Sequence, residues 1–382
     1  MRRLMLGGLV LAGAVAASLC FAQARVDTTE DFQIVYPSPC PSYKPGSTHE
    51  ITYDRNGGHD LWVTGQNYDS IVRVTTSGAR HVYPVERCSG PHGIEFDPHG
   101  RLWVSLEFAG KIVRLDAKQH VDASYDVRLH CTSCVQPINT HPHGMAFADR
   151  GRALWYTGKA TGTVGKITLA TGRVQTFQLP NVGSVPIYIK EGNDGNMWVT
   201  ELLANAIARV TPSGDVKEYP IPTSNSRPIA IVPEPGGHAM WFSEEAGNNV
   251  ARIDEKGTIT EFAVPSSEAN AKVILAGLAF DDQKNLWVQQ YVPPGAPHPG
   301  DDFVIKIDKS ILTAKPSDMA HIPMMPYIVP TKQTVMHRII QGPDGAMWYT
   351  EMMADRVGKV TVAQPRKPMV KMLAPNTRRN AK

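Results

Sequence analysis

The chain has 382 residues, with 39 Lys and Arg against 36 Asp and Glu, which gives a net charge of +3. This near balance excludes a strongly basic surface, so we expect binding neither to nucleic acid nor to an anionic membrane. The 32 glycine and 30 proline residues are typical of many short strands joined by tight turns.

Residues 1–24 have the pattern of a secretory signal peptide. A basic start precedes an apolar run at residues 4–21, and residues 22–24 read Ala-Gln-Ala, the A-x-A form of a cleavage site. The run is too short for a good membrane span. Cys20 would be the acylated residue of a lipoprotein, but Leu19 is a poor match before it. We therefore expect a secreted or periplasmic, monomeric protein without a membrane span.

The mature chain keeps four cysteine residues: Cys40, Cys88, Cys131 and Cys134. An even number in an exported protein suggests disulfide bonds. The spacing of Cys131 and Cys134 also suits a redox pair or half of a zinc site, but no βαβ pattern surrounds it and no second C-x-x-C occurs. We expect all four to be oxidised, with the pairing open.

One sequence unit recurs seven times, as in "PHGIEFDPHGRLWVS" (Pro91–Ser105) and "MHRIIQGPDGAMWYTE" (Met336–Glu351). Two short strands flank a turn, and each of the seven tryptophan residues lies in the second strand. A third strand and often a fourth follow, with no helix. Four strands at a period of roughly 40–60 residues predict an all-β, seven-bladed β-propeller over residues 25–382, whereas the repeats of a β-solenoid are shorter.

Two segments compete to close the ring. Asp31–Pro37 resembles the fourth strand of a unit, although it precedes the first one, and the segment "PMVKMLAP" near the C-terminus competes for the same place. The sixth unit carries an insertion at about residues 291–335. We expect its proline-rich start, Tyr291–Phe303, to cover part of one axial face.

Histidine recurs where the first strand of the unit begins, and around the ring this position reads His49, His92, His143, Ile187, Ile229, Ala276 and His337. Antiparallel pairing brings this position and the end of the second strand to one face near the axis. Glu107 and Glu351 lie at or beside that second position. We expect the histidine and glutamate residues to form the polar wall of a small-molecule pocket, opposite an apolar wall. The alternative is that the histidine residues are structural and were inherited from an ancestral blade.

The stretches "GPDGAMWYTEMMADRVGKVT" and "GNDGNMWVTELLANAIARVT" resemble the repeat of the virginiamycin B lyase family, and the resemblance covers essentially the whole mature chain. It implies a seven-bladed propeller and a carbon–oxygen lyase that opens a cyclic depsipeptide at its ester by elimination, assisted by Mg²⁺. It also implies catalytic roles for His337 and Glu351. The two other site positions of the family hold Val335 and Ala276 in this sequence.

The resulting hypothesis is an exported enzyme that acts on a lactone, an ester or a related small molecule by base-assisted elimination. His337 is the general base, Glu351 is the second catalytic residue, and the binding residues are His49, His92, His143 and Glu107. Glu351, His337 and His49 are the candidate ligands of a divalent metal, for which imidazole favours Zn²⁺, Mn²⁺ or Ni²⁺ over Mg²⁺. The alternatives are a non-catalytic propeller that binds a ligand or partner, and a metal-dependent lactonase or esterase.

Overall fold

The computed structural model describes residues 27–41, 43–130, 132–266, 272–297 and 300–363. Contacts divide the chain into a compact unit, Thr28–Val362, and a second unit formed by Met1–Asp27 and Ala363–Lys382. The expected signal peptide and the segment "PMVKMLAP" lie outside the described residues. Within the described residues, no helix has the length and apolar character needed to cross a membrane.

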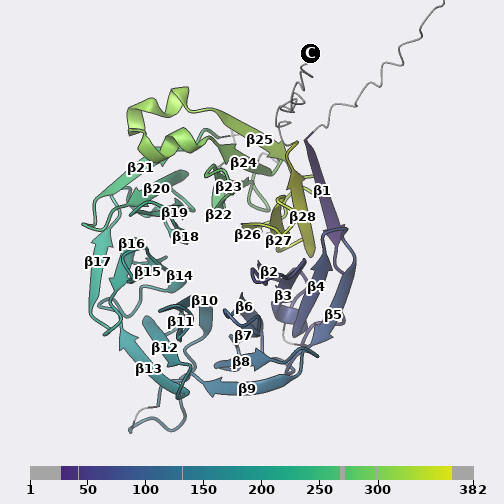
Figure 1. Cartoon of the computed structure of the whole chain (residues 1–382), viewed down its shortest axis with the longest axis vertical. Coiled ribbons are helices and arrows are strands. Elements are labelled where there is room, and N and C mark those ends of the chain that lie inside the picture. The colour runs from purple at the N-terminus through teal and green to yellow at the C-terminus, as the bar shows by residue number, and fades with distance from the viewer. Residues whose placement is uncertain (1–26, 42, 131, 267–271, 298–299, 364–382) are drawn as a thin grey trace, which may run out of the picture. The chain divides into compact units, whose positions relative to one another are not determined.

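The described part of Thr28–Val362 folds into seven four-stranded sheets arranged around an axis, which confirms the predicted propeller (Figure 1). Blade one is β2–β5 (Thr48–Tyr53, Asp60–Gly65, Ser70–Thr75, Arg80–Pro84). Blade two is β6–β9 (Pro91–Phe96, Leu102–Leu106, Lys111–Leu115, Val121–Asp126). Blade three is β10–β13 (Pro142–Ala148, Ala153–Gly158, Thr163–Thr168, Arg173–Gln178). Blades four and five are β14–β17 (Pro186–Glu191, Met197–Glu201, Ala206–Val210, Val216–Pro220) and β18–β21 (Pro228–Pro233, Met240–Glu244, Asn249–Ile253, Ile259–Ala263).

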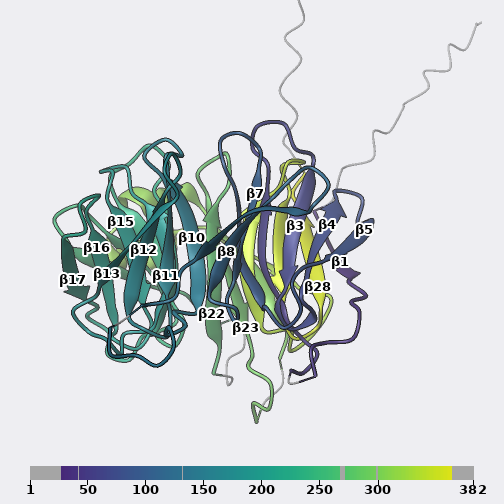
Figure 2. The same ribbon diagram turned by 90° about the horizontal axis from the view of Figure 1, so that it is seen from below.

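Blade six is β22–β25 (Ile274–Phe280, Leu286–Tyr291, Phe303–Ile307, Met324–Ile328), and blade seven combines β26–β28 (Met336–Gln341, Met347–Glu351, Arg356–Thr361) with β1 (Thr28–Gln33). The helices in the described residues are three short 3₁₀ segments: η1 (Gln66–Tyr68), η2 (Lys309–Thr313) and η3 (Pro316–His321). Seen edge-on, the strands of each blade run between two faces that carry the loops (Figure 2).

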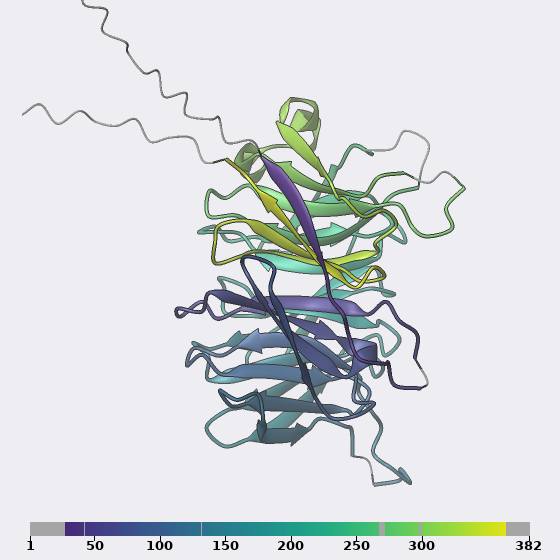
Figure 3. The ribbon, with the colours of Figure 1, turned by 90° about the vertical axis from the view of Figure 1, so that its right-hand side faces the viewer.

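The N-terminal strand closes the ring. β1 pairs antiparallel with β28 along its whole length, from Thr28 opposite Thr361 to Gln33 opposite Arg356. Figure 3 shows this strand beside the last strands of the chain. An ion pair of 2.6 Å between Arg356 and Asp31 adds a polar link. The first of the two competing segments therefore supplies the fourth strand of blade seven.

The seven tryptophan side chains are core residues, none more than 8% exposed. Each stacks on an aromatic ring of the outermost strand of its own blade, at centroid distances of 5.5–5.9 Å. In blade seven the partner of Trp348 is Phe32 of β1. The same stacking in every blade shows that β1 occupies the position of an ordinary fourth strand.

A disulfide bond joins Cys40 and Cys88, whose Cα atoms lie 5.5 Å apart. These residues precede the inner strands of blades one and two, so the bond ties together two loops on one face. Cys134 is also disulfide-bonded, whereas Cys131 lies outside the described residues. The expectation of oxidised cysteine is thus confirmed for the three residues that the structure describes.

Candidate functional site

Each inner strand contains a β-bulge at the position where the sequence places histidine. In blade seven, for example, Met336 faces Glu351 and Ile339 faces Tyr349, so one strand has an extra residue between these pairs. A bulge re-aims the side chains beside it. It also needs space, and a Cβ atom on Gly93 would lie 2.4 Å from the carbonyl oxygen of His143 in the next blade. This close approach explains why glycine follows histidine there.

A hydroxyl group on the second strand links each bulge to the neighbouring blade. In blade one, the backbone N–H of Glu50 donates to Thr64 Oγ1 at 3.1 Å, and this hydroxyl donates to the carbonyl of His92 at 2.8 Å. The donation to the next blade recurs at 2.6–3.3 Å from Ser105, Thr157, Thr200, Ser243 and Thr350. In blade six the amide of Gln289 takes this role. These links fix the backbone that carries each histidine.

Aspartate side chains that are buried or half-buried hold the loops that lead into three of the histidine residues. Asp69 accepts hydrogen bonds from the backbone N–H groups of Ser89 and Gly90 at 3.0 and 3.2 Å, which orders the loop before His92. Asp355 accepts from Ser47 at 2.8 Å before His49. Asp302, at the end of the proline-rich segment Tyr291–Phe303, accepts from the backbone N–H of Thr334 at 2.8 Å before His337. The sequence analysis did not identify these aspartate residues.

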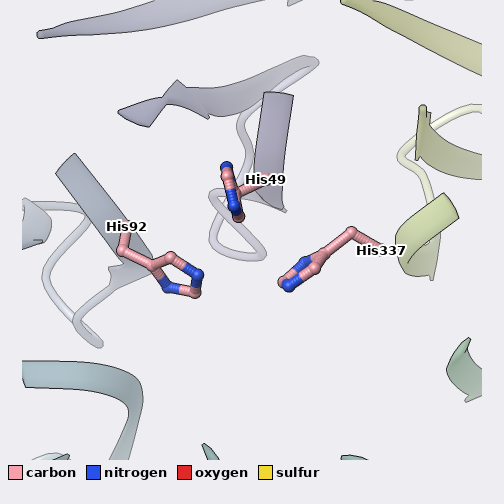
Figure 4. A group of neighbouring side chains, drawn as sticks. All are labelled: His49, His92 and His337. Atoms are coloured by element: carbon pink, nitrogen blue, oxygen red, sulfur yellow. The ribbon is translucent and has the colours of Figure 1, made fainter. Parts of the chain in front are cut away.

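The structure brings the four predicted histidine residues together near the axis. The ring centroid of His49 lies 4.9 Å from that of His92 and 5.0 Å from that of His337, and His92 and His337 are 5.5 Å apart. Figure 4 shows these three rings around one space. His143 lies against His92 on the other side, with centroids 3.6 Å apart.

The imidazole rings are held neutral. Burial is the largest cause in each case. It lowers the pKa of His49, and it lowers the pKa of His143 to about 4. Together with repulsion from neighbouring rings, burial lowers the pKa values of His92 and His337 well below the usual value. A neutral ring has one N–H and one free lone pair. The Nδ1–H of His49 donates to the Ser47 carbonyl at 2.8 Å and that of His143 donates to the Ile187 carbonyl at 3.0 Å, which leaves Nε2 as the basic atom.

Glu107 joins this group as an ionised carboxylate. Burial alone would raise its pKa, but His141, His143 and Lys159 together lower the pKa to about 2. Lys159 Nζ lies 3.1 Å from Oε1, and the side-chain amide of Gln66 donates to Oε2 at 2.5 Å. Glu107 therefore places a fixed negative charge at the edge of the cluster.

Next to the histidine rings, a buried ion pair joins blade one to blade seven. Arg338 donates to both oxygen atoms of Glu50 at 2.8 Å, and its guanidinium carbon lies 3.5 Å from the ring centroid of Tyr188 in blade four. His337 Nδ1 lies 3.3 Å from Glu50 Oε1. Tyr188, Glu50 and Arg338 also line an axial cavity of about 300 Å³. Glu50 is thus the carboxylate nearest His337 among the described side chains.

The sequence analysis missed Glu50 because regular alternation would turn the residue after His49 away from the axis. The bulge removes that alternation. A usable signal existed in the repeats: His49-Glu50 and His337-Arg338 occupy the same positions in adjacent blades and carry opposite charges. Complementary charges at equivalent positions of neighbouring repeats indicate a contact between them.

Glu351 is fully buried on β27, where it pairs with Met336, the residue before His337. Its neighbours are Asp31, Arg356 and Asp302; burial, with repulsion from the two aspartates, raises the pKa of Glu351 to about 8. The carboxylate within 4 Å of His337 among the described residues is that of Glu50, and the catalytic role of Glu351 stays a prediction.

Two residues expected in the apolar wall opposite the histidine residues take part in the hydrophobic core. Ile187 and Ala276 are buried and belong to hydrophobic clusters between blades. Val335, at a position where the resemblance implied glutamate, has a φ of 49°. This left-handed conformation is rare for a β-branched residue, so the turn before His337 is strained.

The cluster does not fit Mg²⁺, the ion that the resemblance implied. Mg²⁺ requires oxygen ligands in nearly octahedral geometry. Both oxygen atoms of Glu50 bind Arg338, and those of Glu107 bind Lys159 and Gln66. The groups that remain are imidazole nitrogen atoms, which suit Zn²⁺, Ni²⁺ or Cu²⁺.

Comparison with known proteins identifies the family. Residues 51–293 match the sequence profile of the Virginiamycin B lyase family. The chain belongs to this family. A curated virginiamycin B lyase from Nocardia farcinica is 31% identical over 180 residues, which are 47% of this chain and 58% of the relative, so the match spans less than two thirds of the relative's length.

Solved structures agree with this assignment. A streptogramin B lyase superposes with a TM-score of 0.70 at 25% identity, over 88% of this chain and 97% of the other. Virginiamycin B lyase from Staphylococcus aureus gives a TM-score of 0.68 at 25% identity, over 88% of this chain and 100% of the other. A hydrazine synthase chain from Kuenenia stuttgartiensis, 14% identical with a TM-score of 0.62 over 86% of this chain and 98% of the other, shares the fold alone.

Proposed function

We propose that this family member is an exported carbon–oxygen lyase that eliminates a carboxylate from a lactone, ester or depsipeptide. The observation that carries the proposal is the neutral, buried imidazole of His337 within a cluster of titratable groups on the axis. Groups of this kind in a concave site are typical of catalysis. The relatives named for streptogramin B and virginiamycin B support an ester-containing small molecule as substrate, and the N-terminal leader supports export.

In the proposed reaction, His337 accepts the proton from a carbon next to a carbonyl group. The electron pair of that C–H bond forms a carbon–carbon double bond, and the C–O bond at the next carbon breaks so that the carboxylate leaves with its electron pair. Glu50, 3.3 Å from His337 Nδ1, stabilises the imidazolium ion that forms. His49, His92 and His143 provide the polar surface on which the substrate lies, with Glu107 at its edge.

The test is a screen of lactones, streptogramin B-type depsipeptides and uronides, followed by ultraviolet absorbance of the new double bond. On any substrate found, His337→Gln keeps hydrogen-bonding capacity but removes the proton acceptor, so turnover should fall about a hundredfold or more while binding changes little.

The matched control is His99→Gln, at an exposed turn between β6 and β7 on the far face, which should leave turnover unchanged. Full turnover of His337→Gln would contradict the proposal. Binding of a ligand from the panel without any turnover would favour the non-catalytic propeller.

A further inference from the structure

The three rings around the axial space have the properties of a site for a transition metal. His49, His92 and His337 each offer a ring nitrogen, and these atoms all lie within 4.8 Å of one another (Figure 4). They come from the inner strands of three consecutive blades: one, two and seven. Their backbones are fixed by the hydroxyl links and the loop aspartates, so the three rings are held near one another before any ligand arrives.

One of the rings carries a nitrogen atom without a partner. Within the described residues, the Nδ1 atom of His92 is buried and makes no hydrogen bond. His92 is only 1% exposed, so water does not readily compensate for the missing bond. Buried polar atoms are normally satisfied, so this unpaired nitrogen atom indicates a missing ligand.

The groups behind the rings match those behind known metal-binding histidine residues. The carbonyl of Ser47 accepts the Nδ1–H of His49 at 2.8 Å, which leaves Nε2 free to coordinate. Glu50 lies 3.3 Å from His337 Nδ1, in the position of the carboxylate in a carboxylate–histidine–metal arrangement. Such partners orient the ring and increase its basicity.

We propose that His49, His92 and His337 bind one Zn²⁺ ion with a fourth position left open. Zn–N bonds of about 2.0–2.1 Å in a tetrahedron place the nitrogen atoms about 3.4 Å apart, so the rings close by about an ångström through side-chain rotation. Three neutral imidazoles and one open position form a common zinc site, and this nitrogen set disfavours Mg²⁺, which prefers oxygen ligands.

The inference has one consequence that rests on the proposed function. A lone pair of His337 that binds Zn²⁺ no longer accepts a proton. Zn²⁺ bound at His337 therefore suppresses the elimination.

The binding test needs no substrate. The mature chain, cleared of metal by chelation, should take up one equivalent of Zn²⁺ by isothermal titration and should give the intense visible absorption of tetrahedral Co²⁺ when loaded with that ion. Mg²⁺ should give no binding heat. His49→Gln and His92→Gln should each weaken Zn²⁺ binding by about a hundredfold or more, and His99→Gln should leave it unchanged.

Retained affinity in both folded variants, or Mg²⁺ binding as strong as that of Zn²⁺, would overturn the proposal. The melting temperature of each metal-free variant shows whether it folds; if one does not, the other decides. In the activity arm, one equivalent of Zn²⁺ should lower turnover at least tenfold. Zn²⁺ binding with unchanged turnover would leave the metal site standing and contradict the role of His337 as base, so the two failures are distinguishable.

Discussion

At the scale of single residues, burial keeps the histidine residues of the inner strands deprotonated and Glu351 of β27 protonated. The four histidine residues face the axis and stay neutral, so they act as lone-pair donors. Glu351 is fully buried in blade seven, where burial and the nearby Asp31 raise its pKa to about 8. Blade six has glutamine, Gln290, at the equivalent position. The position thus favours an uncharged side chain.

Glu351→Gln should therefore change stability in a pH-dependent way. The folded-state pKa of about 8 lies above the ordinary value of 4.5, so the stabilising protonated form is complete below pH 4.5 and is lost as the pH rises through 8. In this window the parent protein should lose on the order of 1 kcal/mol per pH unit through this group, and the variant should not. Thermal unfolding at pH 5 and pH 8.5 measures the difference.

The exposed Glu86→Gln serves as the control, because its side chain is 49% exposed beside Lys111. It should shift stability equally at both pH values. If Glu351→Gln behaved in the same way, the buried carboxyl group would not be protonated in the folded protein.

The position of each histidine could be predicted from the sequence, because the seven tryptophan residues fix the register of the repeats. The identity of the carboxylate next to His337 could not be predicted from the sequence. Its identity depends on a bulge, which shifts Glu50 toward the axis, and a bulge leaves no clear mark in the alternation of polar and apolar residues.

At the scale of elements, the unit that positions the site is a bulge together with a hydroxyl group from the adjacent strand. Thr64 is fully buried, accepts from the N–H of Glu50 and donates to the carbonyl of His92. One side chain thus satisfies two backbone groups in two blades. The residue two positions after each tryptophan is Thr or Ser in six blades and Gln in one. This pattern was visible in the sequence, but its meaning depends on the neighbouring blade.

Thr64→Val, which keeps the shape of the side chain, should lower the free energy of unfolding by about 1–3 kcal/mol, since it leaves a buried N–H and a buried carbonyl without partners. Urea unfolding measures the loss. The half-buried Thr260→Val on β21 is the matched control and should change stability by less than about 0.5 kcal/mol. Equal effects would show that the hydroxyl link contributes nothing specific.

At the scale of the whole molecule, the ring holds together because its first strand completes its last blade. β1 gives blade seven its fourth strand, its aromatic partner for Trp348 and the ion pair of Asp31 with Arg356. Seven repeats predicted the fold, but two terminal segments matched the closing strand equally well. Pairing between residues more than 300 positions apart is decided by three-dimensional contacts, which a repeat pattern does not contain.

A chain that starts at Ile34 lacks β1 and should melt more than about 5 °C below a chain that starts at Asp27, since the stacking on Trp348 and a row of strand hydrogen bonds are lost. The exposed edge of β28 should also promote aggregation, which light scattering detects. Equal melting temperatures and equal scattering would show that β1 is not needed for closure.

The central claim is that the histidine cluster performs an elimination, and the most direct measurement follows oxygen from the solvent. The reaction is run in oxygen-18 water on a substrate from the panel, and the masses of the products are measured by mass spectrometry. Elimination breaks the C–O bond without adding water, so the account predicts a carboxylate without the heavy isotope together with a new double bond, both in one product when the substrate is cyclic and in two products when it is an open-chain ester. One heavy oxygen atom in the carboxylate product would show hydrolysis instead and would contradict the account.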